Sequence, residues 1–202
     1  MGETHAPGTV RPGGRTARTR AAALRAAADI LVEKGFAGLD LAEVAGRAKV
    51  GRTTVYRRWG SAAGLVVDLL ADLPVPPLPD EAADTFEGDL RANALTVRER
   101  LADARQGPLF KAVVAAATCD ARAAEALRRF HRVRVAEWGP CVTRAAERGE
   151  VPHGTDPGEV ALAVSAPLYQ RLLAGLGPVD EAAADRSARA AAAAARAGAY
   201  VR

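Results

Sequence analysis

The segment from residue 40 to residue 59, DLAEVAGRAKVGRTTVYRRW, gathers side chains of the kinds that bind nucleic acid. Arginine pairs bidentately with guanine, threonine contacts a thymine methyl or a phosphate, and tyrosine hydrogen-bonds a phosphate. These side chains are costly to bury, so we expect them to face outward. The predicted outward set is Arg52, Thr53, Tyr56, Arg57 and Arg58. The spacing favours insertion into a DNA groove. The alternative is a helical hairpin with a solvated basic face.

Two short helices, 41–48 and 52–59, must hold these side chains, with a turn of about three residues between them. Asp40 is the expected N-cap of the first helix, and Glu43 stands three residues later, as in a capping box. The inward face of the pair is expected to be apolar, with Leu41, Val44, Ala45, Val50, Val55 and Trp59. A helix over 16–34 would precede the pair, and a helix over 61–73, capped by Ser61, would follow it.

The basic charge is concentrated in the first third of the chain. Residues 1–60 hold 11 Lys and Arg against 5 Asp and Glu, whereas the whole chain carries a net charge of +4. Residues 1–15 show no helical periodicity and are predicted to be a disordered basic arm. Arg11 and Arg15 of the arm, together with Arg18 and Arg20, could reach the DNA backbone or a minor groove. Arg15 and Arg18 are the two that we predict to contact DNA. A tail without function is the alternative.

Residues 24–66, LRAAADILVEKGFAGLDLAEVAGRAKVGRTTVYRRWGSAAGLV, resemble the DNA-binding domain of the TetR family of bacterial repressors. The segments that carry the resemblance are EKGF, LAEVAGRAKV, TTVYRRW and GSAAGL. Residues 107–177 resemble a C-terminal domain found in part of that family. The resemblance implies an all-α homodimer that leaves its operator when a small molecule enters the body. It also implies a phosphate contact for Tyr56, base contacts for Arg52, Thr53 and Arg57, and a base or backbone contact for Arg58.

Three positions depart from the family pattern. Lys49 stands where glycine is usual in the turn, so a residue with a side chain is expected to adopt a left-handed conformation. Asp40 replaces the common Ser or Thr and brings a charge that repels phosphate. Ala62 replaces a lysine at the start of the fourth helix, which removes one expected phosphate contact.

The composition predicts an all-α fold, because alanine supplies about a quarter of the residues and has the highest helix propensity. We expect a three-helix head (16–60) and a larger helical body (61–202) for ligand binding and dimerisation. Helix 61–73 links the two, and a Pro-rich connection covers 74–80. Further helices are predicted at 85–104, 108–118, 120–149, 157–175 and 180–200, which gives about nine in all.

Two sets of body residues are candidates for binding sites. The larger apolar side chains could line a ligand cavity or simply form core; they are Phe86, Leu90, Leu109, Phe110, Val113, Phe130, Val133 and Trp138. Because few buried polar groups are evident, the expected effector is largely apolar. The last two helices are expected to form the dimer interface through Leu168, Leu172, Ala188, Ala192 and Ala195, since small side chains let helices approach closely.

The sequence predicts neither catalytic residues nor a cofactor nor a metal site. His5, His131 and His153 form no HExxH motif, and no phosphate-binding glycine motif is present. Cys119 and Cys141 suit two buried structural thiols better than a redox switch. No apolar run reaches the roughly 18 residues of a membrane span. Two cysteines far apart in the sequence do not form a disulfide-dense scaffold, so a cytoplasmic, reduced protein is expected. Two alternatives to a ligand-responsive repressor remain: a small helical enzyme on the same scaffold, and a DNA-organising protein without an effector.

Overall fold

The computed structural model describes residues 13–73 and 83–202, and within them the fold is all-α, as predicted. No strand occurs in these two stretches, where Thr155 and Val201 form an isolated bridge. None of the described helices is both long and apolar enough to cross a membrane. The helices are α1 (Gly13–Lys34), a 3-10 turn (Phe36–Gly38), α2 (Leu41–Ala48), α3 (Arg52–Trp59), α4 (Ala62–Asp72), α5 (Phe86–Ala102), α6 (Gln106–Ala117), α7 (Ala121–Ala136), α8 (Gly139–Glu147), α9 (Pro157–Ala174) and α10 (Glu181–Arg196).

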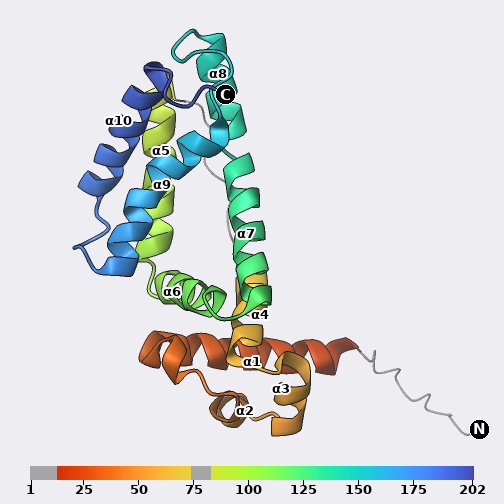
Figure 1. Cartoon of the computed structure of the whole chain (residues 1–202). Helices are drawn as coiled ribbons and strands as arrows, with labels where there is room; N and C mark the ends of the chain where they lie inside the picture. Colours follow the sequence, from red (N-terminus) through yellow and green to blue (C-terminus); the bar gives the residue numbers. More distant parts are fainter. Residues whose placement is uncertain (1–12, 74–82) are drawn as a thin grey trace, which may run out of the picture.

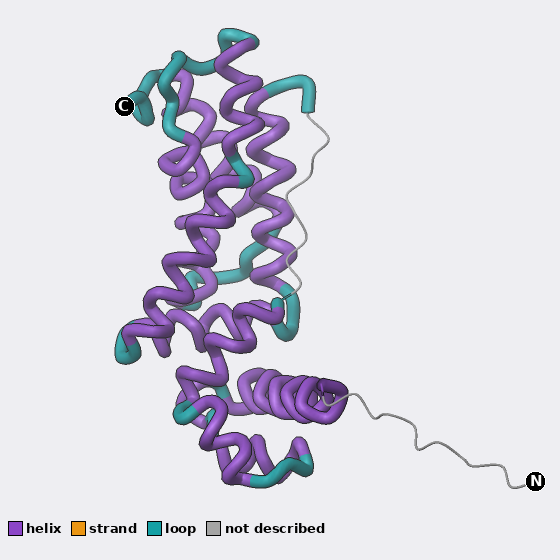
Figure 2. The backbone as a smooth tube through the Cα atoms, turned by 90° about the vertical axis from the view of Figure 1, so that its right-hand side faces the viewer, coloured by secondary structure: helices purple, strands orange, loops and turns teal. Residues whose placement is uncertain are grey.

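The molecule has a small head and an elongated body (Figure 1). Helices α1, α2 and α3 form the head at one end, and α4 rises from it into the body. Helix α6 lies across the base of the body, above α1, while α5, α7, α9 and α10 run along it. Figure 2 shows the same division from the side. The head therefore meets the body through α4 and α6.

Two hydrophobic clusters hold the fold together. The first contains the head core, including Val44, Val55 and Trp59, but it extends into α4 and α6. Leu109 and Val113 of α6 belong to this cluster, so they pack toward the head rather than toward the centre of the body. The second cluster joins α5, α9 and α10. The head and body thus share a continuous apolar contact, and a displacement of α4 or α6 reaches the head directly.

Helix α10 packs on α5 and α9 through a row of alanines, here called the alanine seam: Ala184, Ala188, Ala191, Ala192 and Ala195. All five side chains are at most 2% exposed. This corrects four of the five residues predicted for the dimer interface. Ala188, Ala192, Ala195 and Leu168 are buried inside the protomer, and the half-buried Leu172 packs against the same cluster. An alanine-rich sequence does not reveal which face a helix buries, because its small side chains repeat on every side.

Two further predictions about elements were wrong. Helix α1 begins at Gly13, so residues 13–15, which were predicted to belong to the disordered arm, are helical. The segment 120–149 is two helices, α7 and α8, separated at Glu137 and Trp138. Trp138 is buried, and Gly139-Pro140 begins α8. This dipeptide is a turn signal that would have revealed the break. Residues 1–12 of the arm, which include Arg11, and the Pro-rich connection 74–80 lie outside the described residues.

Candidate nucleic-acid interface and body cavity

The turn between α2 and α3 is built as the sequence predicts. The Asp40 carboxylate accepts a hydrogen bond from the backbone N–H of Glu43 at 3.0 Å, which caps α2. Lys49 has φ 54° and ψ 44°, the left-handed conformation expected at this position. The N–H of Val50 then donates to the carbonyl of Ala45 at 3.0 Å and closes the turn. This geometry fixes the angle at which α3 leaves α2.

Helix α3 has one buried face and one exposed face. Val55 and Trp59 are buried in the head core. The other face exposes the five predicted contact residues together, namely Arg52, Thr53, Tyr56, Arg57 and Arg58. Of the ion pairs between described residues, none involves Arg52, Arg57 or Arg58, although the Arg58 guanidinium lies 5.5 Å from the centre of the Trp59 ring. Three uncompensated cations therefore lie on one short helix.

Two acidic side chains of the head, Glu33 and Glu43, pair with cations outside α3. Arg47 of α2 bridges Glu33 and Glu43, with N–O distances of 2.7 Å to each, and Lys34 contacts Glu43 at 2.8 Å. The hydrogen bond from Arg47 lowers the pKa of Glu33, and those from Lys34 and Arg47 lower the pKa of Glu43. Both carboxylates therefore stay ionised and tied to their own cations, so neither neutralises α3.

Not every arginine proposed for the arm is available to DNA. Arg20 donates from Nε to Asp68 at 3.2 Å and from Nη1 to Asp72 at 2.7 Å, which fastens α1 to α4. This corrects the expectation that Arg20 acts with the arm. Arg18 is exposed on α1, and the backbone of Arg15 belongs to the same helix. The two chosen contact residues are thus carried by α1 rather than by a disordered arm.

Helix α4 is joined to the head at two points. The Asp68 carboxylate accepts hydrogen bonds from Arg20 of α1 and from the Trp59 indole of α3, the latter at 2.9 Å. Ser61 caps α4 by accepting from the N–H of Gly64 at 3.2 Å. A Cβ atom on Gly64 would stand 2.1 Å from the Trp59 carbonyl oxygen, so only glycine allows α4 to begin so close to the end of α3.

A cavity of about 60 Å³ lies in the body where the ends of four helices meet the middle of α9. Its walls come from α4, α5, α6, α7 and α9, and from the α7–α8 junction. Phe110, Phe130 and Trp138 of the predicted set line it. Phe86 and Leu90 are buried in the second cluster instead, Leu109 and Val113 in the first, and Val133 lies on a surface groove beside α4. Hydrophobic character alone did not separate cavity lining from ordinary core.

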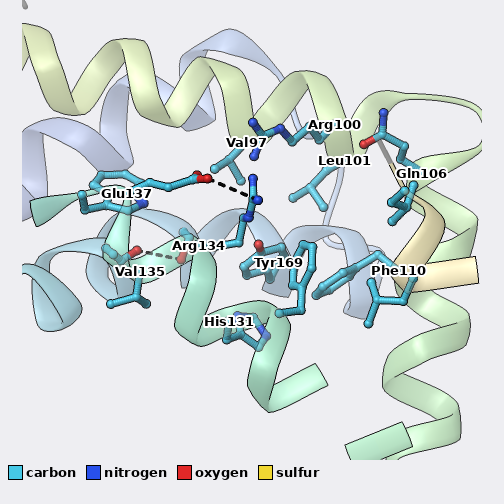
Figure 3. Close-up of a pocket in the computed structure, with 16 residues that line it drawn as sticks. Val97, Arg100, Leu101, Gln106, Phe110, His131, Arg134, Val135, Glu137 and Tyr169 are labelled. Atoms are coloured by element: carbon cyan, nitrogen blue, oxygen red, sulfur yellow. Dashed lines mark hydrogen bonds and ion pairs between the residues drawn. The ribbon is translucent and has the colours of Figure 1, made fainter. Parts of the chain in front are cut away.

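The cavity is more polar than the sequence suggested. Arg100, Arg134, Glu137, His131 and Tyr169 line it, and none of them was predicted. In Figure 3 the guanidinium groups of Arg100 and Arg134 extend toward each other from α5 and α7. The spacing of Phe130, His131 and Arg134 along α7, which puts them on one helical face, was the available signal. The expectation of few buried polar groups is therefore corrected.

Burial controls the charge of the groups that line the cavity. It lowers the pKa of His131, which is consequently neutral at pH 7. Burial also lowers the pKa of Arg100, with Arg134 adding to the effect, and raises that of Tyr169. Phe110 and Tyr169 stack with ring centres 4.6 Å apart, and His131 meets both rings edge to face. The cavity thus has an aromatic side and a cationic side.

The remaining candidate residues form no second site. Cys141 is buried, and burial raises its pKa to about 11, so it remains a thiol. Cys119 is exposed, which corrects the expectation that both thiols are buried, and both cysteines are free. Within residues 13–73 and 83–202, no group of three or more His, Cys, Asp or Glu side chains is placed to hold a metal ion.

Comparison with protein families gives two matches. Residues 23–69 match the family described as "Bacterial regulatory proteins, tetR family", and residues 79–191 match the family described as "Tetracyclin repressor-like, C-terminal domain". The first match contains α2 and α3 with the exposed arginines. The second contains nearly all of the cavity lining.

Individual relatives agree with these matches. The chain is 31% identical over 169 residues to the DNA-binding transcriptional repressor TetR of Mycobacteroides abscessus, covering 81% of this chain and 87% of that one. A TetR-family regulator from Mesorhizobium loti has a similar fold, with a TM-score of 0.65 and 22% identity over 91% of this chain and 98% of that one. The SmeT–triclosan complex has a TM-score of 0.60 and 21% identity, covering 91% and 92% of the two chains.

Proposed function

The chain belongs to the TetR family of bacterial regulatory proteins, and from this premise we propose that it is a homodimeric repressor with a palindromic operator and a small-molecule effector. Members of this family are DNA-binding transcriptional regulators and not enzymes. The single observation that carries the proposal is the exposed face of α3, with Arg52, Tyr56 and Arg57 outward and unpaired with any described acid. The bacterial chromosome as partner implies a cytoplasmic protein.

In this proposal Arg52, Thr53 and Arg57 contact bases, and Tyr56 contacts a phosphate. Arg58 takes a phosphate or a base, and Arg15 and Arg18 add backbone contacts along the start of α1. The short α2–α3 unit suits the major groove, which admits one helix. Arginine contacts to phosphate also make affinity fall with salt.

The dimer would form through the outward face of α9 rather than through the buried alanine seam. Leu162 and Leu173 are 57% and 44% exposed on that face, with the exposed Ala166 between them. Large apolar side chains in a row on one helix favour a partner surface. A two-fold dimer reads two half-sites one helical turn, roughly 34 Å, or a multiple of it apart.

Effector release would run through α4. A cavity of about 60 Å³ is smaller than the roughly 150 Å³ space that accepts benzene, so a ligand must push the walls apart. Leu70 and Leu73 at the end of α4 are part of those walls. Asp68, on the same helix, holds both α1 and α3. Expansion of the cavity would therefore turn the head and change the spacing of the two α3 helices.

Selection of bound sequences from random duplex DNA tests the proposal. A palindrome with half-sites one or two helical turns apart is the expected result. Recovery of no preferred sequence would contradict a specific operator and would instead favour a DNA-organising protein. Recovery of a single half-site would contradict the dimer.

A further inference from the structure

Lys49, in the turn between α2 and α3, has a backbone conformation that lysine rarely adopts. Its φ of 54° and ψ of 44° lie in the left-handed region, which a Cβ atom makes unfavourable. In the part of the chain that the structure describes, the seven other residues with positive φ are all glycine. Glycine would close the same turn without the steric cost. A side chain kept at such a position indicates a use for it.

Contacts within the protomer do not account for a lysine here. The N–H of Lys49 donates to the carbonyl of Gly46 at 3.2 Å, a backbone bond that glycine would make equally well. The Lys49 side chain is exposed, and it takes part in none of the ion pairs between described residues. Lys34, by contrast, contacts Glu43 at 2.8 Å. The ammonium group of Lys49 is therefore available to a partner outside the protomer.

Lys49 lines a surface groove between the start of α1 and α3, here called the α1–α3 groove. Figure 1 shows α3 beneath that half of α1. Among the described residues that line the groove, four are basic, three are threonines and none is acidic. Arg20 is already paired with two carboxylates of α4. The other three cations, Lys49, Arg57 and Arg58, have no ion pair with a described acid.

Cations and hydroxyl groups without a competing carboxylate suit a phosphate. The hydroxyl groups come from both sides of the groove, since Thr16 and Thr19 belong to α1 and Thr54 to α3. A lysine ammonium is a compact charge on a flexible stem, so it can meet a phosphate oxygen whichever base pair stands beside it. Arg57 joins this groove to the exposed face of α3, which is proposed to enter the major groove of DNA.

We propose that Lys49 binds a backbone phosphate of the operator, and that the α1–α3 groove holds the DNA strand that carries this phosphate. This inference rests on the proposed function. It adds a contact on the turn itself to those proposed for Tyr56, Arg15 and Arg18. The unfavourable conformation of Lys49 is then the cost of placing a charge at this point.

The salt dependence of DNA binding tests the contact. We would titrate full-length wild type, Lys49→Gln and Lys49→Arg onto the selected operator and onto a random duplex at several NaCl concentrations. Lys49→Gln should weaken binding to both DNAs to a similar extent and reduce the salt slope by about one unit. Its deficit should therefore shrink about three- to four-fold between 50 mM and 200 mM salt. Lys49→Arg keeps the charge and should keep the wild-type slope.

Lys111→Gln is the matched control, because it removes the same charge from an exposed position on α6. It should change neither the affinity nor the salt slope. Wild-type affinity and slope in Lys49→Gln would overturn the inference. A loss confined to the operator would also overturn it, because a phosphate contact carries no direct sequence information.

Lys49→Gly separates the contact from the fold. It removes the ammonium group and also the unfavourable conformation, so it should bind DNA as weakly as Lys49→Gln while melting at a higher temperature. Damage to the fold cannot lower affinity and raise stability together. Wild-type DNA binding by Lys49→Gly would contradict the contact.

Arg57→Ala in the same titrations tells the two proposals apart. If Arg57→Ala loses operator affinity while Lys49→Gln binds as the wild type does, the repressor stands and the phosphate contact of Lys49 is wrong. If the wild-type protein binds no duplex DNA, the proposed function and this inference both fail.

Discussion

The side chains of α3 are expected to contribute differently to affinity and to specificity. Arg57→Ala should cost about 1–3 kcal/mol on the selected operator if the side chain reads a base. Tyr56→Phe should weaken operator and random DNA to a similar extent, because phosphate contacts carry no direct sequence information. Fluorescence anisotropy with both DNAs measures the difference. Arg132→Ala, on the exposed side of α7, is the control. If both α3 variants bind as the wild type does, α3 is not the reading helix.

Replacing a helical glycine by alanine should have opposite effects on stability at two positions, Gly46 and Gly64. Gly46→Ala in α2 meets open space and should raise stability by up to about 1 kcal/mol, since alanine is the better helix former. Gly64→Ala places Cβ against the Trp59 carbonyl, a backbone atom that cannot move aside cheaply, and should lower the melting temperature. Thermal unfolding without DNA measures both. An increase in both variants would contradict the close approach of α3 and α4.

At the scale of elements, α4 is the link between cavity and head. Asp68→Ala removes the acceptor shared by Arg20 and Trp59 and should cost about 1–2 kcal/mol of stability. It should also reduce the effect of a bound ligand on operator affinity. Asp72→Ala is the matched control, because it removes only the exposed contact to Arg20. The comparison needs ligand titrations with and without operator. Equal coupling in both variants would exclude Asp68 as the link.

The outer face of α9 is expected to hold the dimer together. Leu162→Glu and Leu173→Glu should produce monomers at micromolar concentration and abolish tight operator binding, with the fold intact. Val133→Glu makes the same chemical change on an exposed part of α7 and serves as control. Ala192→Arg is a different case, since it forces a long side chain into the alanine seam and should unfold the protomer. Light scattering with circular dichroism distinguishes the outcomes. Dimeric Leu162→Glu protein would contradict this interface.

Elements with strong local signals could be predicted from the sequence, and elements decided by tertiary packing could not. Helices 41–48 and 52–59 were predicted with the observed bounds, because Asp40, Gly51 and Gly60 mark their ends. The residues that line the cavity could not be predicted, because the sequence does not reveal which side of α6 faces the head. Phe110 turns toward the cavity while its neighbour Leu109 turns away from it. Hydrophobicity is the same in both cases, so no sequence pattern distinguishes them.

At the scale of the whole molecule, acid should destabilise the protein in two steps. The folded state lowers the pKa of His131 from 6.5, so below that pH the unfolded chain binds a proton that the folded chain does not. Stability therefore falls as pH drops below about 6.5, by at most about 1.4 kcal/mol per pH unit for one group. The lowered pKa values of Glu33 and Glu43 give stability that is present above their ordinary pKa and lost at still lower pH.

Chemical denaturation at a series of pH values tests the His131 step. His131→Gln should flatten the dependence between pH 6.5 and 5, and His153→Gln, an exposed loop change, should not. A slope that persists in His131→Gln would mean that another group titrates in this range.

The alanine seam also limits how this protein can evolve. At Ala184, Ala188 and Ala192 every replacement except glycine enlarges the side chain. Random mutation there adds atoms to a close helix contact, and overpacking typically costs about 1–3 kcal/mol. In a mutant library selected at raised temperature, variants in the buried positions of α10 should be lost early. Surviving lineages with a larger residue in the seam should carry a compensating smaller residue on α5 or α9, the two helices on which α10 packs.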